Sequence, residues 1–360
     1  MADRRRINAP SGGTSAPVFV TSATSADQSI PQRPSRTRPP NELRKTFLKT
    51  GLTPSASGSA YLELDRPPYP DGSGSGLPPS TSALKLTCTV HGPRPLPRSA
   101  AFTPNILLST HIKFAPFAAR QRRGYIRDAT ERDLAVHLET ALRGVIIGDR
   151  WPKSGVEIIV TVLEGEEDRW WGDVGRRRPA ELNGIGGCGM MSILAGCITV
   201  ASAAIVDAGI DCVDLIAGGV AAAIPTRGQK EGERPSKSNS RMDQIENQLI
   251  IIDPAPSEHE SITAACLVGY LPSRDEITEL WVKENVSLPG IAPHTKATVP
   301  RALVDELIDR AVGAAIGTGV VLGDAVKEGA ERKINRNGNK VQATRGTKIT
   351  SDSADTVMSG

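Results

Sequence analysis

The sequence lacks the cysteine patterns of two common classes of protein. Its five cysteines are odd in number and widely spaced, with no CxxC pair and no Cys/His cluster. A disulfide framework and a structural zinc site both require such patterns. We therefore expect an intracellular, metal-free protein. The cysteines are Cys88, Cys188, Cys197, Cys212 and Cys266.

The sequence also lacks the patterns that are typical of membrane-spanning and secretory segments. The sequence has no evident run of eighteen apolar residues without a charge, so we expect no membrane-spanning helix. The N-terminus, MADRRRINAPSGG, has basic residues with no apolar region behind them. That arrangement is unlike a secretory signal.

Motifs for hydrolysis, metal binding and cofactor binding are likewise absent or out of context. There is no GxSxG, and the five histidines are scattered without metal-ligand spacing. The stretch GIGGCG at 184–189 matches GxGxxG in its letters, but it follows RRRPAELN where a dinucleotide site needs a strand. We interpret it as a loop and expect no cofactor. The histidines are His91, His111, His137, His259 and His294.

Charge and small residues are distributed unevenly along the chain. Gly and Pro make up about a sixth of the sequence, which indicates long irregular parts around an ordinary core. The net charge is +6 over residues 1–50, +3 over 327–360 and −6 between them. Basic ends are compatible with a nucleic acid partner, and they are also common as solvated tails.

Periodicity predicts an α+β domain in which helices pack on a mixed sheet. Order should begin near Leu43. A helix over 131–147, N-capped by Thr130, shows apolar residues three and four positions apart. Two more helices are expected, over 198–209 and 300–327. The predicted strands lie at 58–64, 83–92, 105–117, 155–164, 212–224, 248–254, 261–272 and 276–284.

The remaining segments predict tails and insertions. Residues 1–42 should form a disordered basic tail and 328–360 a second disordered tail, which leaves one domain over 43–327. Within it, three polar, Gly-rich or charged stretches interrupt the pattern, at 65–82, 165–189 and 225–247. What these insertions contact is left open.

One basic stretch is a candidate RNA contact. KFAPFAARQRRGYIR at 113–127 places four arginines beside Phe114, Phe117 and Tyr125. Guanidinium groups and aromatic rings suit RNA phosphates and unstacked bases. A solvated loop or a protein interface would have the same composition. The four arginines are Arg120, Arg122, Arg123 and Arg127.

Several of these segments together resemble the ribonuclease PH family. They occur in the family's order, and the spacing fits once the insertions are removed, over roughly residues 43–325. The segments are GSAYLEL, LTCTVHGPRP, KFAPFA, ERDLAVHLETAL, WPKSGVEIIVTVLE and ITVASAAIVDAGI. Near the start, DRRRINAP and LRKTFLKTGLTPSASGSAYLE resemble one ring subunit of the eukaryotic RNA exosome in particular.

The resemblance implies a ribonuclease PH-like fold (ribosomal protein S5 domain 2-like) built into a six-membered ring. The implied partners are other ribonuclease PH-like ring subunits, KH and OB-fold cap proteins, RNA, and hydrolytic nucleases associated with the complex. No membrane partner is implied. The implied location is the nucleus, including the nucleolus, and the cytoplasm.

The resemblance also implies that catalysis is lost. Active members hold phosphate with a Gly-Gly-Thr-Arg-Thr turn, and on that pattern Ala195-Gly196-Cys197 would form the turn and Ile198 would replace the arginine. A phosphate dianion needs a cation as well as N–H donors. The family's acidic segment keeps Asp253, while Ala255 and His259 replace its other two carboxylates. We therefore expect no catalytic residue.

Three functions remain in competition at this stage. The favoured one is an inert subunit that scaffolds the exosome ring and helps form its RNA channel. The second is an active phosphate-dependent 3′-to-5′ exoribonuclease. The third is a free-standing RNA-binding protein that uses the arginines of 113–127 and the basic tails.

Overall fold

The computed structural model describes residues 36–65, 84–118, 128–166, 188–225, 248–256, 258–259, 262–284 and 300–352, with the side chains of the last helix as far as 335. All of these belong to one unit of the chain, Arg33–Gly360. The three predicted insertions fall almost entirely outside these ranges.

The first sheet has five strands in the order β1-β2-β3-β5-β4. Neighbours are antiparallel except β4 and β5, which are parallel. The predicted pairing of 58–64 with 83–92 is confirmed, because Ala60 lies opposite Cys88. The strands are β1 (Thr46–Thr50), β2 (Gly58–Leu64), β3 (Lys85–Pro95), β4 (Leu107–Phe114) and β5 (Ser154–Glu164).

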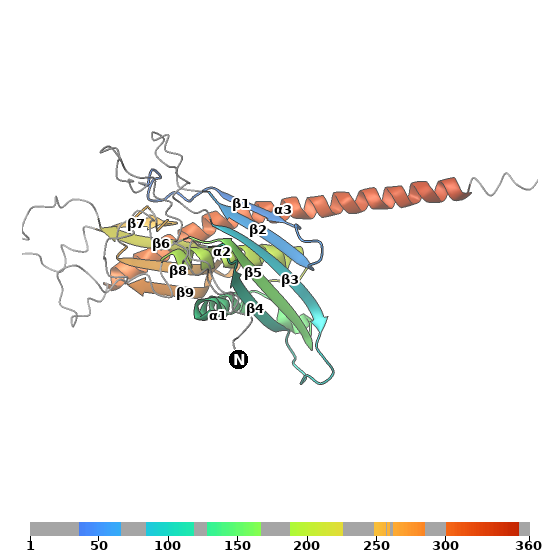
Figure 1. Ribbon diagram of the computed structural model, residues 1–360, viewed down its shortest axis with the longest axis horizontal. Coiled ribbons are helices and arrows are strands. Elements are labelled where there is room, and N and C mark those ends of the chain that lie inside the picture. The colour runs from blue at the N-terminus through green and yellow to red at the C-terminus, as the bar shows by residue number, and fades with distance from the viewer. Residues whose placement is uncertain are drawn as a thin grey trace, which may run out of the picture. The chain divides into compact units, whose positions relative to one another are not determined.

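The second sheet has four antiparallel strands in the order β7-β6-β8-β9. The α+β class is confirmed, but the strands divide between two sheets and do not form one (Figure 1). The strands are β6 (Ala217–Pro225), β7 (Gln248–Ile252), β8 (Ala264–Leu271) and β9 (Glu276–Glu284).

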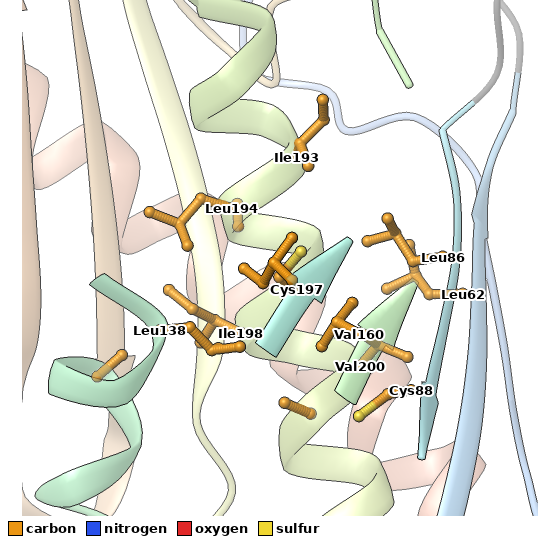
Figure 2. Packing of buried hydrophobic residues seen from close by; sticks show 14 of the residues in the cluster. Leu62, Leu86, Cys88, Leu138, Val160, Ile193, Leu194, Cys197, Ile198 and Val200 are labelled. Atoms are coloured by element: carbon orange, nitrogen blue, oxygen red, sulfur yellow. The ribbon is translucent and has the colours of Figure 1, made fainter. Parts of the chain in front are cut away.

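Helix α2 (Cys188–Asp207) occupies the core and contacts both sheets as well as the other two helices. Seventeen of its twenty residues are buried. Figure 2 shows Ile198 beside Leu138 of α1, and Cys197 near Val160 of β5. A helix that is apolar all round is the expected solution for an element covered on every side.

Small residues let α2 approach the strands closely. A Cβ on Gly218 of β6 would lie 2.5 Å from the Ala195 Cα, and one on Gly58 of β2 would lie 2.7 Å from the Ala208 Cα. Polar side chains in α2 meet backbone groups: the Gly218 N–H donates to Thr199 Oγ1 at 3.0 Å, and Thr199 Oγ1 donates to the Ala195 carbonyl at 3.0 Å. The small residues of this helix therefore serve packing.

Two outer helices complete the fold. Helix α1 (Ala129–Arg143) packs on β4 and β9, and helix α3 (Arg301–Asp352) runs along β6 and β8 and past β1 (Figure 1). The N-cap of α1 is Asp128, with Glu131 completing a capping box, so the predicted cap at Thr130 is wrong. Asp128 wins because its carboxylate accepts from the Ala129 N–H at 2.7 Å.

Several predicted boundaries are also wrong. Helix α2 begins at Cys188, ten residues before its predicted start at 198. Strand β6 begins at Ala217, five residues after its predicted start at 212. Part of the predicted tail 1–42 contacts the domain, since Arg38 Nη1 donates to Asp253 Oδ2 at 3.2 Å. Helix α3 continues to Asp352, through most of the predicted tail 328–360.

The expectation about long apolar runs also needs correction. Helix α2 is long and apolar enough, by length and composition, to cross a membrane, with a mean hydropathy of 2.0 in its most apolar window. That window is 89% buried inside the fold, which is the property of a core helix.

Because β6 approaches α2 so closely, a single methyl group added at Gly218 should lower the stability of the fold. Gly218→Ala should lower the free energy of unfolding by about 1–3 kcal/mol, because the atoms it would strike belong to the backbone of α2 and cannot rotate away. Urea denaturation of the full-length chain measures this.

Gly313→Ala is the matched control. Gly313 lies in the interior of α3, is exposed, and has no atom within 4 Å of an added Cβ. Alanine there should raise the free energy of unfolding by about 0.5–1 kcal/mol through helix propensity. If the two variants moved the urea midpoint equally, the packing account of Gly218 would be wrong.

Candidate functional site

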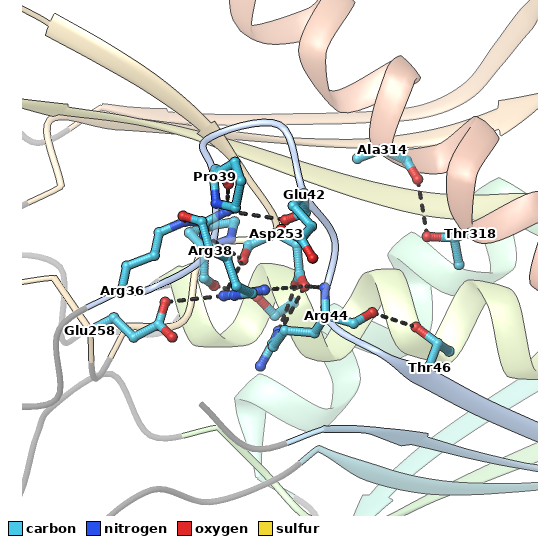
Figure 3. Close-up of polar contacts among 12 residues, drawn as sticks. Arg36, Arg38, Pro39, Glu42, Arg44, Thr46, Asp253, Glu258, Ala314 and Thr318 are labelled. Carbon is cyan, nitrogen blue, oxygen red and sulfur yellow. Dashed lines mark hydrogen bonds and ion pairs between the residues drawn. The ribbon is translucent and has the colours of Figure 1, made fainter. Parts of the chain in front are cut away.

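Buried ion pairs join the N-terminal segment to the turn that follows β7 (Figure 3). Arg44 binds both oxygens of Asp253, with Nη2–Oδ1 at 2.7 Å and Nε–Oδ2 at 2.9 Å. Its backbone N–H donates to Asp253 Oδ2 at 2.8 Å. Arg44 also pairs with Glu166 at the end of β5, so one guanidinium links three parts of the chain.

Arg38 adds a second cation to the same cluster. Its Nη1 lies 3.2 Å from Asp253 Oδ2, and its Nη2 lies 3.1 Å from Glu258 Oε2. The Glu258 side chain is fully buried, and those of Arg44 and Glu166 are 2% and 4% exposed. Such charges are tolerated in an interior only when they are paired and hydrogen-bonded.

The backbone at Asp253 is shaped to receive these cations. Asp253 has φ of +47°, a left-handed conformation that Asp adopts more readily than most residues. Its N–H donates to the Val220 carbonyl at 2.8 Å, which holds the turn on β6. Nearby, the Ile252 N–H donates to the Pro40 carbonyl at 2.9 Å, so the N-terminal segment adds a backbone contact as well.

The electrostatics of the cluster favour permanent ionisation of Asp253. Burial alone would raise the pKa of Asp253, but attraction and hydrogen bonds from Arg44, with Arg38, outweigh it and hold the pKa well below its ordinary value. For Glu166, burial dominates and raises the pKa in spite of Arg44. The pKa of Arg44 is raised: burial lowers it, and Asp253 and Glu166 together outweigh burial.

A cavity of about 40 Å³ lies beside the cluster, between Arg44, Asp253, Ser192 and Thr199 of the described chain. A cavity of this volume can hold a water molecule. Among the described residues no group of three or more His, Cys, Asp and Glu is placed to hold a metal ion.

Comparison with known proteins assigns the chain to a family. Residues 42–211 match the model of the 3′ exoribonuclease family, domain 1 (RNase PH). The chain is 47% identical over 328 residues to the exosome complex component MTR3 of Chaetomium thermophilum, across 91% of this chain and 99% of that protein. The chain belongs to the ribonuclease PH family.

More distant relatives agree with this assignment. Human exosome complex component MTR3 is 26% identical over 290 residues, across 77% of this chain and 82% of the human protein. The crystal structure of rice Rrp46 matches with a TM-score of 0.51 at 15% identity, across 81% of this chain and 98% of that one. The likeness to Rrp46 is one of fold, and it confirms the ribonuclease PH-like fold expected from the sequence.

The structure does not form the predicted phosphate turn at residues 195–197. Ala195, Gly196 and Cys197 are in the middle of α2, where their amides belong to the helix, and Ile198 is fully buried (Figure 2). The prediction of a turn there is wrong, because Gly196 serves a close contact: a Cβ on it would lie 2.7 Å from Leu86 Cδ1. The glycine-rich residues 184–187 before α2 lie outside the described residues.

Three of the other predicted site residues lie in or near the ion-pair cluster, and four lie outside the described residues. Asp253 lies in the ion-pair cluster, Ala255 is buried beside it, and His259 Nε2 lies 3.9 Å from Glu258 Oε2. The four candidate RNA contacts fall outside the described residues, so the structure gives no account of them. They are Arg120, Arg122, Arg123 and Arg127.

Sequence reasoning missed four members of the cluster. Arg36, whose Nη1 donates to the Asp253 carbonyl at 3.4 Å, lies with Arg38 and Arg44 in the basic segment RPSRTRPPNELRK. Glu166 lies at the edge of an expected insertion. Their partner Asp253 is 209 positions from Arg44. The density of arginines there is a signal for a charged contact, but the sequence does not indicate which carboxylates they meet.

The geometry of the cluster predicts a large loss of folding stability when Arg44, its central cation, is removed. Arg44→Met should lower the free energy of unfolding by about 3–5 kcal/mol, because it leaves Asp253 and Glu166 buried without their main partner. Denaturant titration of the full-length chain measures this.

Arg143→Met provides the comparison. The Arg143 side chain is 74% exposed and pairs with Glu139 one turn earlier in α1. Its loss should cost about 0.5 kcal/mol or less. Equal costs for the two variants would contradict the role given to Arg44.

Proposed function

We propose that this chain is a non-catalytic subunit of the RNA exosome core ring. In this role it scaffolds the assembly and helps form the channel for 3′-to-5′ processing and degradation of RNA. Membership of the complex is supported by the match to MTR3 of Chaetomium thermophilum, which extends over nearly the whole length of both proteins.

The state of Asp253 carries the non-catalytic part of the proposal. It is the one carboxylate that the resemblance retains from the acidic segment of active members. Arg38 and Arg44 engage both of its oxygens, so it has little capacity left to bind a metal ion or to exchange a proton with a leaving group. Ala255, at the second acidic position, offers no group that could replace it.

Exposed apolar side chains on the outer strands of both sheets support the proposal that the chain works within a protein assembly. Each outer strand carries a large apolar side chain with substantial exposure, and such strand edges are normally covered by a neighbour. These side chains are Phe47 on β1, Leu107 on β4, Leu249 on β7 and Leu280 on β9, exposed by 55%, 50%, 41% and 47%.

The proposed partners follow from the same assembly. They are other ribonuclease PH-like ring subunits, KH and OB-fold cap proteins, RNA, and hydrolytic nuclease subunits that supply the cleavage chemistry. The proposed location is the nucleus, including the nucleolus, and the cytoplasm. Within the ring, the segment with Arg120, Arg122, Arg123 and Arg127 is proposed to contact RNA.

A phosphorolysis assay separates this proposal from the alternative of an active exoribonuclease. The purified chain, given single-stranded RNA and inorganic phosphate, should release no nucleoside diphosphates above background. Chromatography of the products measures this. Phosphate-dependent release of nucleoside diphosphates by the purified chain would overturn the proposal.

Charge reversal tests the proposed RNA path. Arg120→Glu, Arg122→Glu and Arg123→Glu together should raise the Kd of the assembled complex for RNA by about tenfold or more at physiological salt, since lost phosphate contacts and added repulsion act together. Fluorescence anisotropy measures the Kd. A variant with Arg143, Arg150 and Arg274 changed to Glu carries the same net charge and should bind nearly as wild type. Unchanged affinity in the first variant would reassign the segment to a protein interface.

A further inference from the structure

Helix α3 leaves the domain at a defined point. Gly329 is the last buried residue of the helix whose burial is described, and its Cα faces the Thr50 side chain so closely that a Cβ would collide with it. From 330 to 335 every residue is exposed. The helical backbone nevertheless continues to Asp352.

An ion pair fixes the point of exit. Lys333 Nζ lies 2.8 Å from Asp207 Oδ1 and donates to the Asp207 carbonyl at 2.5 Å. Asp207 is the last residue of α2, where the helix dipole is negative and attracts a cation. Gly329 and Lys333, one turn apart, therefore hold α3 against the domain immediately before the helix departs.

The segment beyond this point, residues 336–352, is strongly basic, and we refer to it as the basic arm. It contains Arg336, Lys340, Arg345 and Lys348 against the single acid Asp352. Between the cations its sequence is rich in Asn, Gln, Thr and Ser, whose amides and hydroxyls donate hydrogen bonds to phosphate oxygens. The composition is that of a segment that binds polyanions.

The basic arm lacks the features of a helix that docks on protein or lipid. Its apolar residues are Val341, Ala343 and Ile349, apart from two glycines, and no two of these three are separated by three or four positions. A groove-binding or membrane-surface helix needs an apolar face at that spacing. Two glycines and two asparagines also give the arm weak helix propensity.

We propose that the basic arm is an RNA-binding element that contacts backbone phosphates outside the domain. This inference rests on the proposed function, which brings RNA to the complex. The arm contains no aromatic residue, so stacking of bases on aromatic rings contributes nothing, and contacts to phosphates carry no base-sequence preference. Phosphate contacts of this kind release counterions, and each one steepens the salt dependence of binding by a known amount.

The salt dependence of RNA binding provides the test. The variant carries Arg336→Gln, Lys340→Gln, Arg345→Gln and Lys348→Gln in the full-length chain. The probes are fluorescein-labelled oligo(U) and oligo(A), titrated by anisotropy from about 50 to 300 mM KCl. Neutralisation should reduce the slope of log K against log salt by about 2–3, at about 0.7 per phosphate contact on single strands. Affinity at 0.1 M salt should fall by tenfold or more, equally for both probes.

A control of equal charge separates contact from net charge. Arg143, Arg150, Arg274 and Arg301 are exposed residues within the domain, and changing all four to Gln removes the same charge. This control should leave the salt slope within about 0.5 of wild type. Equal slope changes in the two variants would overturn the proposal, as would an unchanged slope in the arm variant.

Copurification with exosome subunits distinguishes failure of this inference from failure of the proposed function. If the arm variant keeps the wild-type salt slope but loses its copurifying subunits, the arm is a protein-docking element and the inference is wrong while the proposed function stands. If the wild-type chain itself copurifies with no exosome subunit, the proposed function fails, whatever the arm binds.

Discussion

The burial of α2 on all sides is the constraint on which the rest of the structure depends. A helix placed between two sheets packs closely on both, and at the points of closest approach even a Cβ would keep helix and strand apart. Gly58 on β2, Gly218 on β6 and Gly196 within α2 each remove a Cβ at such a contact. The same closeness lets Thr199 and Ser202 satisfy backbone amides of the chain leading into β6. The close packing of α2 on β6 therefore also brings the hydroxyls of Thr199 and Ser202 within hydrogen-bonding distance of backbone amides.

The ion-pair cluster acts at the surface of this core and joins distant parts of the chain. Arg44 lies directly before β1, Glu166 directly after β5, and Asp253 directly after β7. One guanidinium therefore fixes the ends of strands from both sheets. A site built this way is closed by its own cations, which favours stability over exchange with a ligand. The contacts that stabilise the fold here also occupy both carboxylate oxygens of Asp253.

Local patterns in the sequence predicted the elements well, and contacts over long range account for what they missed. The alternation in GSAYLEL and LTCTVHG sufficed to pair β2 with β3, and the spacing of Leu134, Leu138 and Leu142 sufficed for α1. The small residues at 195–197 were misread as a turn, because glycine for a turn and glycine for close packing are identical in sequence. The pairing of Arg38 and Arg44 with Asp253 depends on how the two sheets fold together, and neither the spacing nor the composition of the segments encodes it.

The length of α3 beyond its last contact has an electrostatic consequence. Seventeen helical residues at about 1.5 Å each extend roughly 25 Å, about three times the Debye length of about 8 Å at physiological ionic strength. The acidic central part of the chain, with a net charge of −6 over residues 51–326, is therefore screened from the far half of the arm. The protein as a whole is nearly neutral, yet an anion beside the basic arm meets mainly positive charge. The acidic central part of the chain and the far half of the basic arm therefore interact only weakly with each other through their charges.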